Sequence, residues 1–249
     1  MLHTVQGIVL RTTDYGEGNK IVRLLTREAG KVGVMARGAK KLNSRLGAAS
    51  QAFTRGEYVY FRTSGLGTLS SAEIADAHHG LREDLMKSAY AAYMAEMVDR
   101  MLEDGDGSAV LFDQLAAALT AIEENKDAQI VVHIFELRML MLAGYMPVLD
   151  TCVSCGSSSG PAAFSPQLGG TLCPNCLFKD PRGVPLTEAA WKLLRMFVGI
   201  DIRRLGATTV KPETKAVLKS ILRAYMDTHI GVNWKARSFL DQMEKYPLP

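Results

Sequence analysis

The chain has 249 residues, with 29 Lys and Arg, 26 Asp and Glu, four Cys and 47% apolar residues. This composition is typical of a protein with hydrophobic cores, and it excludes collagen-like, disordered and disulfide-dense classes. No apolar run approaches the roughly 18–20 residues that a membrane-spanning helix needs. The first residues lack the charged-then-apolar order of a secretory signal. We therefore expect an intracellular, cytoplasmic protein with no membrane partner.

The net charge changes sign along the chain. Residues 1–62 carry a net charge of +7, residues 73–136 carry −10, and residues 137–249 carry +6. This partition indicates segments that face different partners, unless the charge only keeps each surface in solution. The acidic middle would repel DNA, so we expect it to face protein or solvent.

Residues 5–74 have the pattern of short β-strands. Five runs rich in β-branched and aromatic residues are separated by turn signals at 14–18, 29–30 and 64–67. One long connection, between Met35 and Glu57, can hold a short helix. The pattern therefore predicts an OB-type five-stranded β-barrel. Tyr58, Tyr60 and Phe61 could stack on bases, but we expect at least one face of their strand to lie in the barrel core.

From about residue 81 the apolar residues recur at helical spacing. One amphipathic stripe runs from Leu85 to Leu102, a second helix follows Ser108 as its N-cap, and a third spans about 127–143. Two further helices are predicted at 187–197 and 212–229. The predicted fold class is therefore α+β. An OB-fold nucleic-acid-binding domain occupies residues 1–80, and an α-helical domain over 81–249 is interrupted by a metal-binding insert at 150–182.

All four cysteines lie in this insert, as Cys152, Cys155, Cys173 and Cys176. The spacing C-x2-C-x17-C-x2-C is typical of two knuckles that hold one Zn²⁺ by four thiolates. Four thiolates leave no open coordination position, so we predict one structural zinc ion and no catalysis at the metal. The alternatives are two redox pairs, two disulfides or four reduced cysteines without a ligand. A redox pair normally opens a helix in a βαβ setting, and a cytoplasmic location disfavours disulfides.

A basic segment, RGAKKLNSR, joins the third and fourth predicted strands and contains no acid. A flexible basic loop at the rim of an OB barrel can follow a phosphate backbone. The alternative is a loop that only improves solubility. The predicted nucleic-acid-binding residues are those of the loop, followed by three from neighbouring strands: Arg37, Lys40, Lys41, Arg45, Lys20, Arg23 and Arg11. No motif for a phosphate-binding loop or a zinc protease occurs, and we assign no catalytic residue.

The chain resembles the RecO recombination mediators of bacteria, in the form common among Gram-positive species. The resemblance covers nearly the whole chain. The residues that carry it are GNKIVRLLTREAGKVGVMARGAKKLNSRLGAASQAF, FELRMLMLAGYMPVLDTCVSCG, FSPQLGGTLCPNC and HIGVNWKARSFLDQM. Lys235, Arg237 and Phe239 belong to the last of these segments, and we interpret them as packing or interaction residues.

The resemblance implies a non-enzymatic role in DNA repair and homologous recombination, at the nucleoid. It implies binding of single- and double-stranded DNA, annealing of complementary strands, and loading of RecA, with RecR, onto DNA coated by single-stranded DNA-binding protein. The C-terminal tail of the coating protein is expected to dock on the helical domain. An apolar groove with a basic rim would suit that tail, and the candidate cations are Arg138, Lys192, Arg195, Arg203 and Arg204.

The residues also allow a different function. OB barrels and zinc knuckles occur together in RNA-binding factors of the translation machinery. A zinc-ribbon RNA-binding factor is therefore the alternative prediction.

Overall fold

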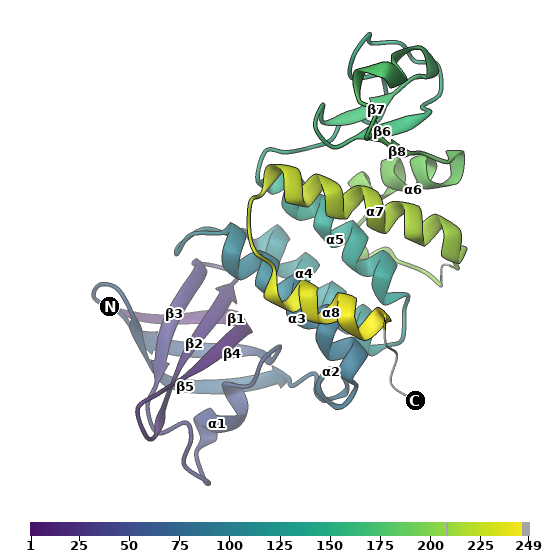
Figure 1. The fold of residues 1–249 in the computed structure, drawn as a ribbon. Helices are drawn as coiled ribbons and strands as arrows, with labels where there is room; N and C mark the ends of the chain where they lie inside the picture. The colour runs from purple at the N-terminus through teal and green to yellow at the C-terminus, as the bar shows by residue number, and fades with distance from the viewer. Residues whose placement is uncertain (208, 246–249) are drawn as a thin grey trace. The chain divides into compact units, whose positions relative to one another are not determined.

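The computed structural model describes residues 1–207 and 209–245 (Figure 1). The chain forms two compact units. Among the described residues, one unit contains 1–125 and 234–245, and the other lies within 126–233. None of the described helices combines the length and the apolar character needed to cross a lipid bilayer.

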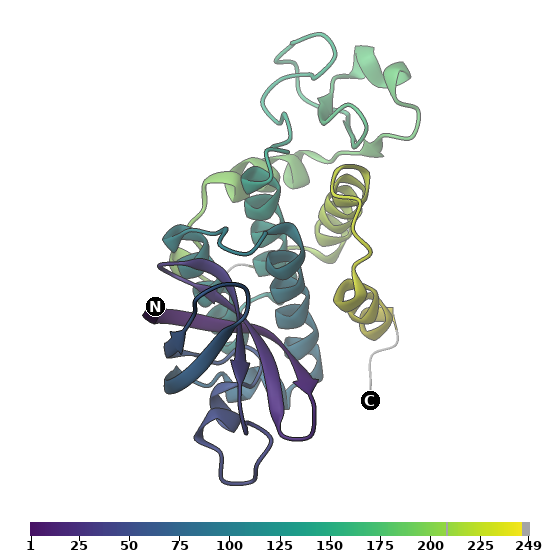
Figure 2. The ribbon, with the colours of Figure 1, turned by 90° about the vertical axis from the view of Figure 1, so that its left-hand side faces the viewer.

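The first unit begins with a closed five-stranded barrel (Figures 1 and 2). Its strand order is β1-β2-β3-β5-β4, and all neighbours are antiparallel except β3 and β5, which pair in parallel through Val34 and Gly67. A short helix α1 (Arg45–Ala49) lies in the β3–β4 connection, as the sequence predicts. The OB-type barrel is therefore confirmed. Its strands are β1 (Leu2–Tyr15), β2 (Asn19–Thr26), β3 (Gly30–Ala36), β4 (Arg55–Phe61) and β5 (Gly67–Asp76).

The barrel core is built from the inward-facing residues of every strand. Val9, Val22, Val34, Tyr58 and Tyr60 are all buried. The Tyr58 hydroxyl donates a hydrogen bond to the carbonyl of Ala49, at 2.9 Å, which attaches the end of α1 to β4. Burial raises the pKa of Tyr58. Tyr58 and Tyr60 point into the core, whereas Phe61 is half exposed. The prediction that at least one face of this strand lies in the core is therefore confirmed.

Four helices complete the first unit: α2 (His79–Glu83), α3 (Leu85–Met101), α4 (Ala109–Glu123) and α8 (Lys235–Lys245). The predicted stripe from 85 to 102 corresponds to α3, and the side chain of Asp84 caps this helix by accepting the N–H of Lys87. Ser108 caps α4 in the same way, as predicted. α8 packs against α3. Both carboxylate oxygens of Glu96 accept the first N–H groups of α8, at 2.8 and 2.9 Å.

The loop between α3 and α4 attaches the barrel to the helices. The N–H of Lys31 donates to the carbonyl of Asp106, and the N–H of Gly105 donates to the carbonyl of Lys31, both at 2.7 Å. Gly30 has φ +64°, and a Cβ at this position would lie 2.4 Å from the carbonyl oxygens of Gly105 and Asp106. Only glycine therefore allows this approach between strand and loop.

The second unit consists of three packed helices and the cysteine-containing insert. The helices are α5 (Ala128–Leu142), α6 (Glu188–Gly199) and α7 (Pro212–His229), and a 3-10 turn η2 (Ile202–Arg204) follows α6. The insert contains a small sheet of order β7-β6-β8 and a 3-10 helix, η1. Its elements are β6 (Ala163–Ser165), β7 (Gly170–Leu172) and η1 (Pro174–Lys179), and the last strand of the sheet, β8 (Val184–Pro185), lies just beyond residue 182.

Candidate metal centre and nucleic-acid interface

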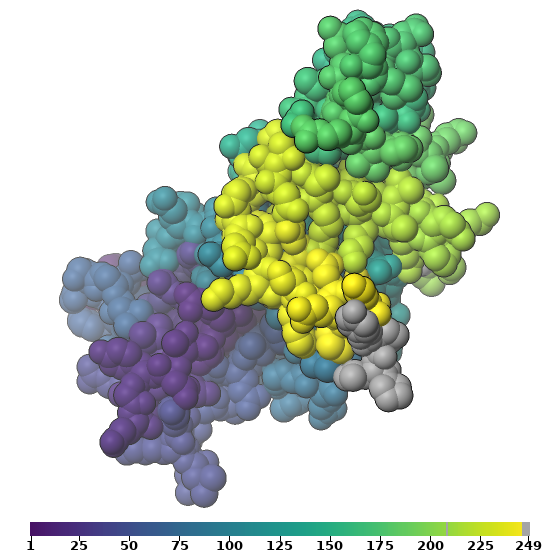
Figure 3. Space-filling view, in the orientation of Figure 1, coloured from purple at the N-terminus to yellow at the C-terminus, as the bar shows by residue number. Residues whose placement is uncertain are grey.

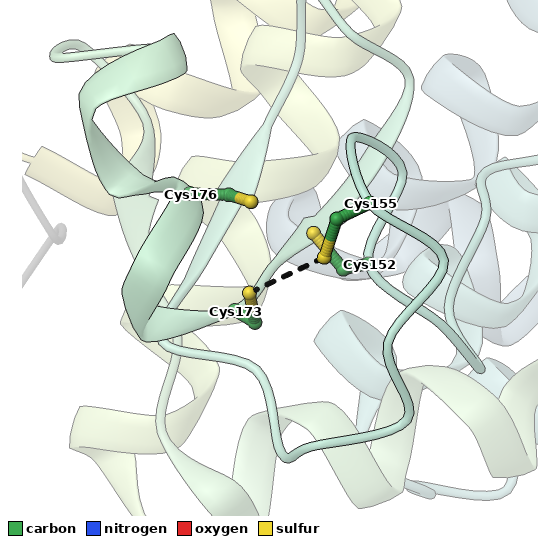
Figure 4. A group of neighbouring side chains, drawn as sticks. All are labelled: Cys152, Cys155, Cys173 and Cys176. Carbon is green, nitrogen blue, oxygen red and sulfur yellow. Dashed lines mark hydrogen bonds between the residues drawn. The ribbon is translucent and has the colours of Figure 1, made fainter.

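The four cysteine sulfurs of the insert converge on one point (Figure 4). All four Sγ atoms lie within 4.8 Å of one another, and those of Cys155 and Cys173 are 3.7 Å apart. Zn–S bonds of about 2.3 Å in tetrahedral geometry place sulfurs about 3.8 Å apart. No disulfide is formed. The predicted ligands are thus brought together with a spacing that can hold a metal ion.

Each knuckle is closed by a backbone turn. The N–H of Gly156 donates to the carbonyl of Cys152 at 2.8 Å, and the N–H of Cys176 donates to the carbonyl of Cys173 at 2.9 Å. Gly156 has φ +74°, a conformation that favours glycine. Three of the thiols are buried, and Cys155 is exposed.

The surroundings shift the pKa values of two of the thiols in opposite directions. Burial alone would raise the pKa of Cys152, but backbone N–H groups of Cys173, Cys155 and Ser154 outweigh it and lower the pKa to about 6. Burial and the neighbouring sulfurs of Cys155, Cys173 and Cys152 raise the pKa of Cys176 to about 12. Four sulfurs at one point cannot all ionise without a compensating cation, so the donor set fits a divalent metal.

A groove of about 350 Å³ lies on the barrel beside the predicted basic loop. It is bounded by the β1–β2 turn, the end of β3 and the β4–β5 connection, which form the face that binds oligonucleotides in OB folds. Tyr15 and Leu66 are exposed there, and Arg37 lines the groove. The full lining is Tyr15, Asn19, Met35, Arg37, Leu66, Gly67 and Thr68.

The basic loop is fastened to the edge of this groove. The side-chain oxygen of Asn19 accepts the N–H of Gly38 at 2.9 Å, and the N–H of Lys40 donates to the carbonyl of Gly18 at 3.1 Å. Arg37, Lys40, Lys41 and Arg45 are all exposed. Lys40 also forms a 2.7 Å ion pair with Asp14, and this hydrogen bond lowers the pKa of that carboxyl.

The remaining predicted DNA-binding residues have different surroundings. Lys20 lies opposite Asp14 and Ala36 in the barrel, next to the basic loop. Arg11 and Arg23 lie opposite each other on β1 and β2, and each pairs with a carboxylate outside the barrel. The Arg11–Asp99 distance is 2.5 Å and the Arg23–Asp104 distance is 2.8 Å.

A third pair, Arg27–Asp113 at 2.8 Å, repeats this arrangement. Part of the acidic middle segment therefore faces the basic barrel within the same unit. Net charge along the sequence could not indicate this, because these partners are more than 80 residues apart.

Sequence reasoning missed Tyr15 and Leu66 as groove residues. Both belong to segments recognised only as turn signals, and only barrel closure brings them to one face. Four of the five rear cations already have acceptors in the fold. Arg195 pairs with Asp150, Lys192 with Glu188 and Arg203 with Asp201, while Arg138 donates to the carbonyl of Ile200. Arg204 is exposed on η2.

A groove of about 450 Å³ lies beside Arg195 in the second unit. Met146 and Met196 are exposed at this groove. Its lining is Met146, Pro147, Leu149, Asp150, Arg195, Met196 and Val198. It combines apolar walls with one arginine and one exposed aspartate, and these two side chains pair with each other.

Fold and sites together define a class of protein: an OB-type barrel with an open groove and a basic loop, in one chain with a helical unit that carries a four-cysteine metal centre. Two family models match this chain. The model described as Recombination protein O N terminal covers residues 1–78, and that described as Recombination protein O C terminal covers residues 82–238.

Curated relatives match over nearly their whole length. DNA repair protein RecO of Bacillus pumilus (strain SAFR-032) is 48% identical over 98% of this chain and 95% of the relative. The protein of the same name from Bacillus subtilis (strain 168) is 47% identical, and that from Halalkalibacterium halodurans is 43% identical, each over 98% of this chain and 96% of the relative. The chain belongs to the RecO family.

Proposed function

We propose that the protein is a non-enzymatic mediator of DNA repair and homologous recombination, acting in the cytoplasm at the nucleoid. It binds single- and double-stranded DNA, anneals complementary strands and, with RecR, helps to load RecA onto DNA coated by single-stranded DNA-binding protein. The observation that carries this proposal is the OB-face groove with its attached basic loop. The names of the relatives support the repair role.

The geometry of the groove suits binding without base readout. Exposed Tyr15 and Leu66 offer apolar surface to bases, while four cations of the adjacent loop can neutralise phosphates. An annealing protein must hold strands by their backbones and leave the pairing edges accessible. We assign a smaller contribution to Arg11, Arg23 and Lys40, because each already pairs with a carboxylate.

We propose residues 1–80 as the DNA-binding domain and residues 81–249 as the helical domain, interrupted by the insert at 150–182. The matched family models, which end at 78 and begin at 82, support this functional division. We propose that the metal is one Zn²⁺ with a structural role, held by Cys152, Cys155, Cys173 and Cys176. Tetrathiolate sites are typical of structural zinc.

We place the C-terminal tail of the coating protein in the groove beside Arg195. Apolar walls and a cation suit an acidic peptide with an apolar tip. Met196→Asp should abolish binding of a fluorescent tail peptide and leave DNA binding intact. Val110→Asp, at an exposed apolar position of the first unit, is the matched control. Equal peptide binding by both variants would place the tail elsewhere.

The function is tested by annealing complementary oligonucleotides pre-coated with single-stranded DNA-binding protein, with and without RecR. The wild-type protein should accelerate annealing, and Arg37→Ala/Lys40→Ala/Lys41→Ala/Arg45→Ala should not. Annealing by this variant at the wild-type rate would remove the basic loop from the mechanism. A competition between DNA and RNA strands of equal length tests the alternative, since a strong preference for RNA would favour an RNA-binding factor.

A further inference from the structure

The insert presents an aromatic ring to solvent immediately after its last cysteine. Phe178 is 72% exposed, more than any other aromatic side chain among the described residues. Its neighbour Leu177 is also exposed. The green surface of the insert is not covered by α5, α6 or α7 on the face that Figure 3 shows. We call Leu177, Phe178, Lys179 and Arg182 the insert tip.

The exposed charges of the insert tip are both positive. Residues 151–187 contain three charged side chains, Lys179, Asp180 and Arg182. Asp180 is buried, and its oxygens accept the Ser165 hydroxyl at 2.5 Å and the N–H of Arg182 at 3.0 Å. Lys179 and Arg182 are exposed, and Nζ of Lys179 lies 5.3 Å from the centroid of the Phe178 ring. An exposed ring is therefore accompanied by two cations and no exposed carboxylate.

The metal centre fixes this presentation. η1 starts directly after Cys173, and Cys176 turns its sulfur inward. The N–H of Asp180 donates to the carbonyl of Leu177 at 3.3 Å, which closes the turn that carries the ring. A phenylalanine left in water loses the free energy that burial of its ring would give. An uncovered apolar group rimmed by cations is typical of an interaction site.

We propose that the insert tip is a second contact for single-stranded DNA, in which Phe178 stacks on a base and Lys179 and Arg182 pair with flanking phosphates. Rings that stack on bases beside cations are the usual means of binding single strands without sequence preference. The proposal rests on the proposed function and deepens it, because each compact unit then carries one strand contact. Annealing needs two strands held at once, and a contact on each unit would allow this.

The test uses the full-length, zinc-loaded protein and oligo(dT) containing one 2-aminopurine, whose fluorescence falls on stacking. Phe178→Ala should weaken binding about 5- to 100-fold and remove the quenching, whereas Phe178→Trp should retain both. Leu168→Ala, at an exposed apolar position of the insert outside the tip, should bind as wild type. Lys179→Ala/Arg182→Ala should flatten the plot of log K against log salt by about 1.4.

Zinc content is measured for every variant, and the expected value is one ion per chain in each. If the basic-loop variant loses DNA affinity while Phe178→Ala keeps wild-type affinity and quenching, the tip is not a DNA contact and the proposed function stands. The same holds if Phe178→Ala loses only binding to an acidic, apolar peptide. If the wild-type protein binds no DNA, the proposed function itself fails.

Discussion

The Sγ atoms of Cys155 and Cys173 lie 3.7 Å apart, although 18 residues separate them in the chain. This spacing corresponds to the edge of a tetrahedron around zinc. We predict one zinc ion per chain in freshly purified, reduced protein, measured by elemental analysis. Cys173→Ser should lower the zinc content and expose the insert to proteolysis, because the glycine- and serine-rich segment between the knuckles has little core of its own. Ser159→Ala, in the same loop, should keep the ion. Wild-type protein without metal would refute this assignment.

Zinc binding should be linked to pH through the thiols. The pKa of Cys152 is about 6, so this group is already ionised at pH 7.5, whereas the raised pKa of Cys176 requires loss of a proton on binding. Zinc uptake at pH 7.5 should therefore release fewer than four protons per chain, measured by calorimetry in buffers of different ionisation enthalpy. Affinity should already fall with pH above 6, because Cys176 must lose a proton, and should fall more steeply below about pH 6, where Cys152 also becomes protonated. Release of four protons at pH 7.5 would contradict the lowered pKa.

Replacement of Gly30 should strongly destabilise the first unit. In Gly30→Ala the added Cβ meets two carbonyl oxygens at 2.4 Å in a left-handed backbone conformation, so we expect a loss of about 3 kcal/mol or more. Gly65→Ala is the matched control, because Gly65 has φ +58° and no atom within 4 Å of the added Cβ. It should lose only about 1 kcal/mol.

Urea unfolding followed by tryptophan fluorescence measures this difference in a Trp191→Phe background. The remaining Trp234 is buried in the first unit, where its ring meets that of Tyr93 edge to face. Equal losses for the two glycine variants would mean that the loop at 103–107 does not pack against Gly30 in solution.

Lys31 should contribute more to stability than the exposed cations of the barrel. Its side chain is buried, and Nζ donates to the carbonyls of Asp99, at 2.6 Å, and Leu102, at the end of α3. Lys31→Met leaves these acceptors without a donor, at a cost of about 2 kcal/mol. Lys41→Met, at an exposed position, should change stability by less than about 0.5 kcal/mol. The same fluorescence assay measures both, and an unchanged Lys31→Met midpoint would contradict the role assigned to the ammonium group.

Local pattern was enough to predict the barrel strands, most helices and the cysteine ligands. The β-branched runs need burial on one face, and Ser108 and Thr187 cap their helices through their own side chains. The C-x2-C spacing lets both sulfurs of a knuckle turn toward one metal ion, whatever the rest of the fold. The apolar stripe from Leu85 to Leu102 also predicts α3, which begins directly after Asp84, where the chain is extended with ψ 119°.

Features made by distant partners could not be predicted from the sequence. The return of α8 to α3 depends on Glu96, 139 residues before Lys235. Arg11, Arg23 and Lys41 are all cations of the same basic segment of the sequence. Only the fold shows that Arg11 and Arg23 pair with carboxylates of the acidic segment. The groove at Tyr15 and Leu66 likewise exists only once the barrel closes.

The salt dependence of single-stranded DNA affinity tests the central claim most directly. Arg37→Ala/Lys40→Ala/Lys41→Ala/Arg45→Ala should weaken binding and flatten the plot of log K against log salt by up to about 2.8, because up to four phosphates are no longer neutralised and each contributes about 0.7 on a single strand. A variant with the wild-type slope and affinity would show that the groove and its loop do not bind DNA.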